Sequence, residues 1–229
     1  MSNDFTPDQK RYLEGFASGL NAARTARGQP SGGGGARAPE GPDAVHFEAQ
    51  NRVLASGGKL ADQEKFKREL HPFDAYGRLK EQARENQPPK PADNFRWRFY
   101  GLFYVAPAQN SYMCRLRIPN GILKYGQLDG LAHVAEAYGG GYAHVTTRAN
   151  IQIREIEAHN AVNVLEAVQD LGLTARGAGA DNIRNVTGTP TAGIDPQELL
   201  DTRSHAREWH FHVLNDRSLT GLPRKFNVA

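Results

Sequence analysis

The sequence predicts an α+β fold in which helices cover one face of a small antiparallel sheet. Residues 95–173 can be read in order as strand, strand, helix, strand and helix. The expected strands alternate apolar and polar side chains, which gives each of them one apolar face. The expected helices carry apolar residues near the 3.6-residue period. Because these apolar faces must bury one another, sheet and helices should form two packed layers.

The composition limits the classes of function that this chain can have. A formal net charge of +3 is compatible with an acidic partner or ligand, but it is too weak to argue for nucleic acid. The single cysteine, Cys114, excludes an intrachain disulfide and a cysteine-built metal site. The first residues lack the apolar run of a secretory signal, and no stretch is long enough to span a bilayer. We therefore expect a cytoplasmic protein with no membrane partner.

Residues 1–93 are expected to form a helical N-terminal extension. Within it, residues 28–43 are rich in glycine and proline and predict a flexible linker. Residues 44–86 alternate short helical patterns with turns and lack a strong apolar stripe. We expect this part to wrap a larger body rather than to build a core of its own.

The first two strands are expected at residues 95–107 and 111–121. In the second, Arg115 and Arg117 share one face, whereas the other face carries Tyr112, Cys114, Leu116 and Ile118. A helix with a glycine stop is expected at residues 124–141. A second helix is expected at residues 158–173, where the apolar stripe consists of Val162, Leu165, Val168 and Leu171.

A third strand is expected over residues 146–156, with the sequence TTRANIQIREI. With a period of two, its apolar face carries Thr147, Ala149, Ile151 and Ile153. The opposite face is a row of hydrogen-bond donors, extended backwards by His144 and made of Thr146, Arg148, Asn150, Gln152 and Arg154. An ordinary solvated strand face would mix in carboxylates, so this row calls for an anionic ligand or for acidic partners elsewhere in the chain.

The last part of the chain predicts a tight loop, a helix and a short strand. The loop carries Arg184 and Asn185. Asp195 should cap the helix, with Pro196 in its first turn and Glu198 closing a capping box. An apolar and basic strand begins near the end, in LTGLPRKFNVA.

The polar face of the expected sheet and the nearby loops gather cationic and neutral donors. They are Arg115, Arg117, Arg148, Asn150, Gln152, Arg154, Arg184, Arg224 and Lys225. Arginine suits bidentate recognition of carboxylate or phosphate, so a ligand with several carboxylates or a nucleic-acid backbone would fit. Equally, the face could be paired with acidic residues from elsewhere in the chain. The absence of interleaved aromatic residues weakens the case for single-stranded nucleic acid.

Four segments carry a resemblance to a known family. They are GLFYVAPAQNSYMCRLRIPNG, HVTTRANIQIREI, DNIRNVTGTPTAGIDPQELLDTR and LPRKFN. Together they make residues 99–229 resemble the N-terminal half of the assimilatory nitrite/sulfite reductases, which use sirohaem coupled to a 4Fe-4S cluster. The resemblance implies a ferredoxin-like half domain at residues 94–178 and the start of a sirohaem-binding α/β domain at residues 179–229.

The resemblance also implies roles for individual residues. Arg148 and Arg184 match the family arginines that reach the substrate anion, Lys225 matches the active-site lysine, and Asn227 stands where some members have a second lysine. The candidates for the cofactor's carboxylates are Arg115, Arg117, Asn150, Gln152, Arg154, Asn185 and Arg224. These roles suit the side chains, because arginine stays charged and lysine can deliver protons.

One departure from the family is the cysteine content. The family holds its cluster with two pairs of cysteines, whereas this chain has only Cys114, which the pattern places in the core. We therefore expect the first part of an enzyme, inactive alone, whose partners are nitrite or sulfite, ferredoxin as electron donor and the missing C-terminal half.

Ferredoxin-dependent nitrite reductase is the first reading of this resemblance. The alternatives are a sulfite reductase, a relative that modifies a precorrin, and a non-catalytic remnant that binds an anion or a tetrapyrrole.

Overall fold

The computed structural model describes residues 40–106 and 109–229, and both ranges belong to one compact unit. Most of the predicted linker at residues 28–43 lies outside the described residues; in its last part a turn precedes the first described helix. The expected fold class is confirmed, because a four-stranded antiparallel sheet packs against helices. No helix among the described residues is long and apolar enough to cross a bilayer.

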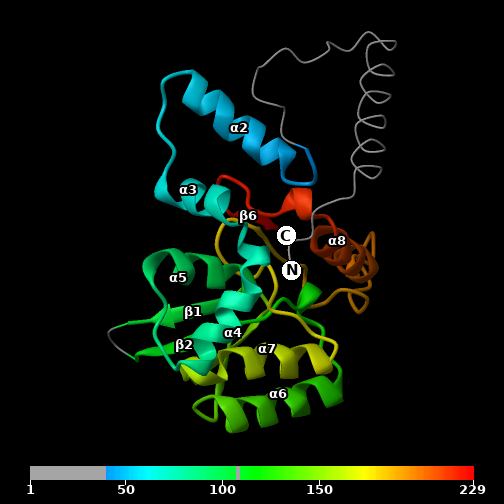
Figure 1. The fold of residues 1–229 in the computed structure, drawn as a ribbon. Helices are drawn as coiled ribbons and strands as arrows, with labels where there is room; N and C mark the ends of the chain where they lie inside the picture. Colours follow the sequence, from blue (N-terminus) through cyan, green and yellow to red (C-terminus); the bar gives the residue numbers. More distant parts are fainter. Residues whose placement is uncertain (1–39, 107–108) are drawn as a thin grey trace, which may run out of the picture. The chain divides into compact units, whose positions relative to one another are not determined.

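The central sheet has the strand order β1-β2-β4-β3. Its strands are β1 (Leu102–Val105), β2 (Ser111–Arg115), β3 (Ala143–Val145) and β4 (Ile151–Ile156). Two of the expected helices, α6 (Tyr125–Tyr138) and α7 (Ala161–Asp170), lie side by side against it (Figure 1). The core between the layers contains Cys114, Ile153 and Val164, all fully buried.

The N-terminal part is helical, as the patterns of residues 44–86 predict. The elements are α2 (Ala44–Ala55), α3 (Asp62–Glu69), the short helix η1 (Pro72–Asp74), α4 (Tyr76–Arg84), α5 (Pro91–Trp97) and the short helix η2 (Arg98–Tyr100). Leu79 of α4 is buried in the main core, so this part contributes to that core as well as covering it.

The predicted strand at residues 95–107 is wrong in its first half. Residues 91–100 are helical, and β1 begins only after Gly101. The aromatic residues that favour a strand, Trp97 and Phe99, are instead fully buried at helical positions. Gly101 allows the change of direction with a φ of 81°, and a Cβ there would lie 2.5 Å from the carbonyl oxygen of Arg115.

The strand predicted over residues 146–156 is confirmed only in its second part, because residues 146–150 form the turn of a hairpin. β3 ends at Val145, a turn follows, and β4 begins at Ile151. The Oγ1 atom of Thr146 accepts hydrogen bonds from the backbone N–H groups of Arg148 and Asn150, and Ala149 has a φ of 51°. The row of donors is therefore divided between a turn and a strand.

A bulge near the end of β4 changes which side chains of the strand point to the core. Cys114 pairs with Ile153, but Tyr112 pairs with Ile156, so β4 holds one extra residue there. Glu155 lies at this irregularity with a φ of 56°. Strict alternation would place Ile156 on the donor face, whereas the bulge returns its side chain to the core, where it is fully buried.

The C-terminal part forms a second, two-stranded parallel sheet of β5 (Ile183–Val186) and β6 (Phe226–Val228). The short strand expected at the end is confirmed as β6. The loop expected around Arg184 and Asn185 is wrong, because both residues belong to β5. They pair with a strand some 40 residues later, which no local pattern reveals.

The helix predicted at Asp195 does not form. The Oδ1 atom of Asp195 accepts a hydrogen bond from the backbone N–H of Gln197 within a turn, and Glu198 accepts one from the backbone N–H of Gly193 rather than closing a capping box. Helix α8 (Arg203–Asn215) follows instead. The remaining short helices are η3 (Pro119–Gly121), η4 (Ala158–Asn160) and η5 (Arg217–Leu219).

Candidate anion site

The turn between β3 and β4 is anchored to both strands of the parallel sheet by Arg148. Its Nη2 atom donates to the carbonyl oxygens of Asn185 on β5, at 3.1 Å, and Val228 on β6, at 3.2 Å. The Nε atom of Arg148 is buried without a hydrogen-bond partner. The guanidinium is thus fixed at the sheet, and its Nε–H group remains without a partner.

The side chain of Asn185 holds the same region together by hydrogen bonds to backbone carbonyls. Its Nδ2 atom donates to the carbonyl oxygens of Ile118, at 2.7 Å, and Arg148, at 3.1 Å. The side chain is buried, and its Oδ1 atom has no partner. Asn185 therefore joins three segments: the chain just after β2, the turn and β5. In this way it positions Arg148.

Arg184 lies on β5 next to these groups. Its Nη1 and Nη2 atoms donate to the carbonyl oxygens of Ala178, at 2.6 Å, and Ala180, at 2.7 Å. Burial, together with the positive charges of Arg115 and Arg148, lowers the pKa of Arg184 to about 10. Arg115 and Arg148 thus lie close enough to Arg184 for their charges to act on it.

Arg115 and Gln152 face each other on neighbouring strands of the central sheet. With its amide oxygen turned towards Arg115, Gln152 accepts hydrogen bonds from the Nε atom, at 3.1 Å, and the Nη2 atom, at 3.2 Å. The guanidinium of Arg115 also lies over the ring of Phe103, 4.6 Å from its centre. Burial lowers the pKa of Arg115. Arg154, two residues further along β4, has a buried Nε atom without a partner.

Arg224, Lys225 and Asn227 are exposed in and before β6. Ile183 pairs with Phe226 and Val186 with Val228, so β5 holds one extra residue between these pairs, and Lys225 and Asn227 lie in and next to the strand that pairs with β5. The structure thus brings Arg148, Arg184 and the β6 residues to the same small sheet.

Arg117 and Asn150 have different surroundings from the rest of the predicted set. Arg117 is 1% exposed, and its guanidinium donates to the carbonyl oxygens of Gly177 and Ile183. Burial and the charge of Arg184 lower its pKa to about 10. The Oδ1 atom of Asn150 accepts from the backbone N–H of Ile118 at 3.0 Å. In this structure both side chains hold the backbone of the site, and their contact with a cofactor stays a prediction.

The cluster of cations has no carboxylate partner within the described part of the chain. No ion pair there involves Arg115, Arg148, Arg154, Arg184, Arg224 or Lys225. The negative charge of Asp181 acts on Arg184 without forming an ion pair with it. Among the described residues, therefore, acidic side chains of the chain itself do not neutralise the donor face by ion pairs. The set of donors fits a ligand with several carboxylates.

An iron–sulfur cluster does not fit these residues. The described part of the chain contains no group of three or more His, Cys, Asp or Glu side chains that could hold a metal. Cys114 is fully buried, and burial raises the pKa of its thiol to about 12. A neutral, enclosed thiol is not a metal ligand, because metals bind the thiolate.

Sequence reasoning missed Lys67, a residue of α3 that is tied to the site. Its Nζ atom donates to the carbonyl oxygens of Gly221, at 3.1 Å, and Leu222, at 3.0 Å. It also forms ion pairs with Glu64 and, at 3.5 Å, with Asp181. These contacts join α3 to the segments that lead into β5 and β6. A lysine in the highly charged sequence DQEKFKRE gives no local sign of burial.

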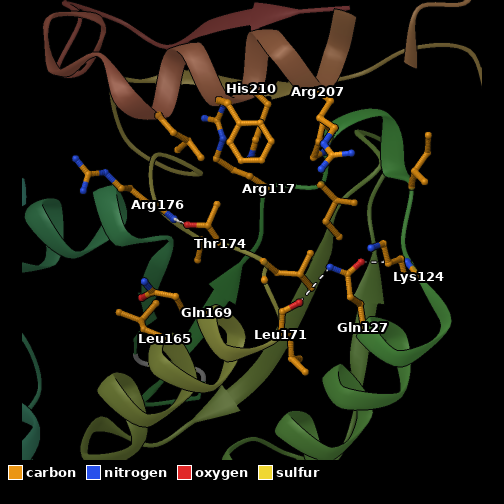
Figure 2. A pocket seen from close by; sticks show the side chains of 18 of the residues that line it. Arg117, Lys124, Gln127, Leu165, Gln169, Leu171, Thr174, Arg176, Arg207 and His210 are labelled. Atoms are coloured by element: carbon orange, nitrogen blue, oxygen red, sulfur yellow. Dashed lines mark hydrogen bonds between the residues drawn. The ribbon is translucent and has the colours of Figure 1, made fainter. Parts of the chain in front are cut away.

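A cavity of about 1060 Å³ lies elsewhere, between α7 and α8 (Figure 2). Of the predicted site residues only Arg117 lines it. A second hollow of about 780 Å³ is lined by apolar parts of β5, β6 and α8, including Val186, Trp209 and Val228.

Two family descriptions match this chain. The nitrite/sulfite reductase ferredoxin-like half domain matches residues 106–171, and the nitrite and sulphite reductase 4Fe-4S domain matches residues 179–229. Both ranges include residues of the cationic cluster.

Individual relatives agree with these matches. The ferredoxin–nitrite reductase of Leptolyngbya laminosa is 44% identical over 139 residues, covering 58% of this chain and 27% of that protein. The chloroplastic ferredoxin–nitrite reductase of Oryza sativa subsp. japonica is 38% identical over 185 residues, covering 74% and 31%. The chain thus spans between a quarter and a third of the length of these two relatives.

A solved structure has the same fold. The NirA protein of Mycobacterium tuberculosis superposes with a TM-score of 0.69 at 24% identity, covering 77% of this chain and 36% of that one.

Proposed function

Because the chain belongs to the nitrite/sulfite reductase family, we propose that it is the N-terminal part of a ferredoxin-dependent nitrite reductase that reduces nitrite to ammonia. The observation that carries the proposal is the cluster of Arg115, Arg148 and Arg184, which has no ion-pair partner in the described residues. Such a cluster is unfavourable unless an anion joins it. The names of the relatives favour nitrite as the substrate.

Sirohaem, the family's cofactor, would supply the iron at which the oxyanion is reduced. The donor set fits its carboxylates through Arg115, Gln152, Arg154 and Arg224, whose side chains are at least partly accessible. Arg117, Asn150 and Asn185 hold the backbone that presents these donors. The unpartnered Nε atom of Arg154 is a donor for one such carboxylate.

The substrate anion would be held by Arg148 and Arg184. Both side chains are anchored by backbone carbonyls, so little conformational entropy is lost when they bind an anion. A guanidinium whose pKa is about 10 is still protonated at neutral pH. Lys225 would deliver protons to the reduced oxyanion, and Asn227 would donate a hydrogen bond without adding charge.

The family's 4Fe-4S cluster needs four thiolates, whereas this chain has one cysteine, and the described residues hold no other group that could bind a metal. We therefore propose that the C-terminal half of the reductase carries the cluster ligands and that ferredoxin donates electrons to that half. In this proposal residues 1–93 are the extension, residues 94–178 the half domain and residues 179–229 the start of the sirohaem domain. The complete enzyme would work in the cytoplasm.

The experiment is an assay of the complete reductase that carries this sequence, with reduced ferredoxin as the donor. The proposal expects ammonia from nitrite and a higher kcat/KM for nitrite than for sulfite. A preference for sulfite would favour the sulfite reductase alternative. No reduction of either anion by a preparation that contains sirohaem would contradict the proposal and favour a precorrin-modifying enzyme or a non-catalytic remnant.

A further inference from the structure

The cavity between α7 and α8 has the chemistry of a second ligand site. We propose that it binds an organic anion, meaning an apolar body that carries a carboxylate or a phosphate group. Figure 2 shows Arg207 and His210 of α8 on one side of the cavity and Leu165 and Gln169 of α7 on the other. The inference does not depend on the proposed reductase function.

The charge of the lining residues points to an anion. Four cations lie along the rim, and among the described residues no Asp or Glu lines the cavity. The four are Lys124, Arg176, Arg203 and Arg207. Arg203 is neutralised by Asp201 at 2.7 Å, whereas no ion pair of the described residues involves the other three. Cations of one sign that gather around a concave surface attract an anion.

Three buried polar atoms of the lining residues lack hydrogen-bond partners. They are the Oη atom of Tyr100, the Nε atom of Arg117 and the Nδ1 atom of His210. Arg117 is 1% exposed and His210 is 4% exposed, so neither belongs to the open rim. Buried polar groups are nearly always paired, and each unpaired one costs free energy. A ligand oxygen would satisfy donors that the chain itself leaves open.

The apolar residues that line the cavity indicate a ligand larger than an inorganic ion. Leu165, Leu171, Leu173, Phe211 and Leu214 are among the lining residues. The volume of about 1060 Å³ is at the upper end of ordinary small-molecule pockets, which reach roughly 1,000 Å³. Burial of an apolar body against these side chains would supply binding energy that phosphate alone could not obtain.

The rim arginines are held in place without a bound ligand. The guanidinium of Arg176 lies 3.9 Å from the centre of the Phe73 ring, and that of Arg207 lies 5.8 Å from the centre of the Phe211 ring. Such cation–π contacts hold a guanidinium without neutralising its charge. The two arginines therefore stay available to an anion.

The test uses 8-anilinonaphthalene-1-sulfonate, an aromatic anion whose fluorescence rises on binding, with the full 229-residue chain. The double variant Arg176→Gln/Arg207→Gln removes both rim charges and keeps most of the side-chain volume. We expect it to weaken binding of the probe at least tenfold. The control Trp209→Leu, which alters the other hollow, should leave the affinity unchanged. Thermal unfolding of each variant shows whether it is folded.

Uncharged N-phenyl-1-naphthylamine provides the second comparison, because it has the same rings without the sulfonate. It should bind at least tenfold more weakly than the anion. Octanoate and octyl phosphate should both displace the probe, and the stronger competitor identifies the preferred head group.

Equal affinity of the two probes would overturn the inference, and so would unchanged binding in the double variant or loss of binding in Trp209→Leu. Absence of binding in the complete reductase would show that the rest of the enzyme fills the cavity, which would also overturn it.

Discussion

Substitution of Lys67 by methionine should destabilise the chain strongly, although the residue lies in a charged surface helix. Only 5% of its side chain is exposed, and the Nζ atom lies among Glu64, Asp181 and the carbonyl oxygens of Gly221 and Leu222. Methionine fills a similar volume but leaves the two carboxylates and two carbonyls without a cation. Removal of one partner from a buried ion pair typically costs about 3–5 kcal/mol. Since Glu64 and Asp181 keep some contact with solvent, we expect a loss of about 3 kcal/mol.

Lys65 on the same helix is a matched control. Its side chain is 61% exposed, and its ion pair with Asp62 lies at the surface. The change Lys65→Met should therefore cost less than about 0.5 kcal/mol. Urea unfolding of the 229-residue chain, followed by circular dichroism, measures both variants. Equal losses for the two lysines, or a loss below about 1 kcal/mol for Lys67→Met, would refute the reasoning.

Three further predictions concern activity, substrate choice and pH. The 229-residue chain alone should reduce neither nitrite nor sulfite with a chemical electron donor, because its single cysteine cannot supply the thiolates of the cluster; a turnover assay decides this. In the complete reductase, Asn227→Lys should shift the kcat/KM ratio towards sulfite about tenfold, or roughly 1.4 kcal/mol, because sulfite is partly a dianion; an unchanged ratio would exclude the effect. Burial lowers the pKa of His71 and His210 to about 4. Between pH 6.5 and 4 the unfolded chain therefore binds more protons than the folded chain. The free energy of unfolding should therefore fall as the pH drops through this window, and the change should be smaller in His71→Gln.

The sequence was most informative where a periodic pattern of apolar residues extends over a long stretch of the chain. The helices expected at residues 124–141 and 158–173 are confirmed as α6 and α7, although α7 buries Ala161, Val164 and Val168 rather than the whole predicted stripe. The sequence did not predict helix α5. A run of aromatic residues has strand propensity whether it packs in a helix or in a sheet. The turn at residues 146–150 contains neither glycine nor proline, so no local signal marked it; Ala149 takes the left-handed conformation instead.

The candidate site could be predicted only in part, for a similar reason. Alternation placed Arg115 and Arg117 on one face, and both are indeed near Arg184. However, alternation cannot show that Arg117 is buried, because its partners are carbonyl groups some 60 residues later in the chain. The burial of Lys67 likewise depends on a segment more than 150 residues away. Long-range contacts of this kind leave no periodic signal.

The most direct test of the anion site is the affinity of the complete reductase for nitrite, followed through the absorption spectrum of its sirohaem. Arg148→Gln/Arg184→Gln removes the two charges that would hold the substrate, while the carbonyls that anchor them retain amide donors in reach. Hydrogen bonds to charged groups contribute about 1.5–3 kcal/mol each, so the Kd for nitrite should rise at least a hundredfold, which corresponds to about 2.8 kcal/mol. The sirohaem content should stay unchanged in this variant. A Kd within about threefold of the unsubstituted enzyme, with sirohaem still bound, would contradict the account.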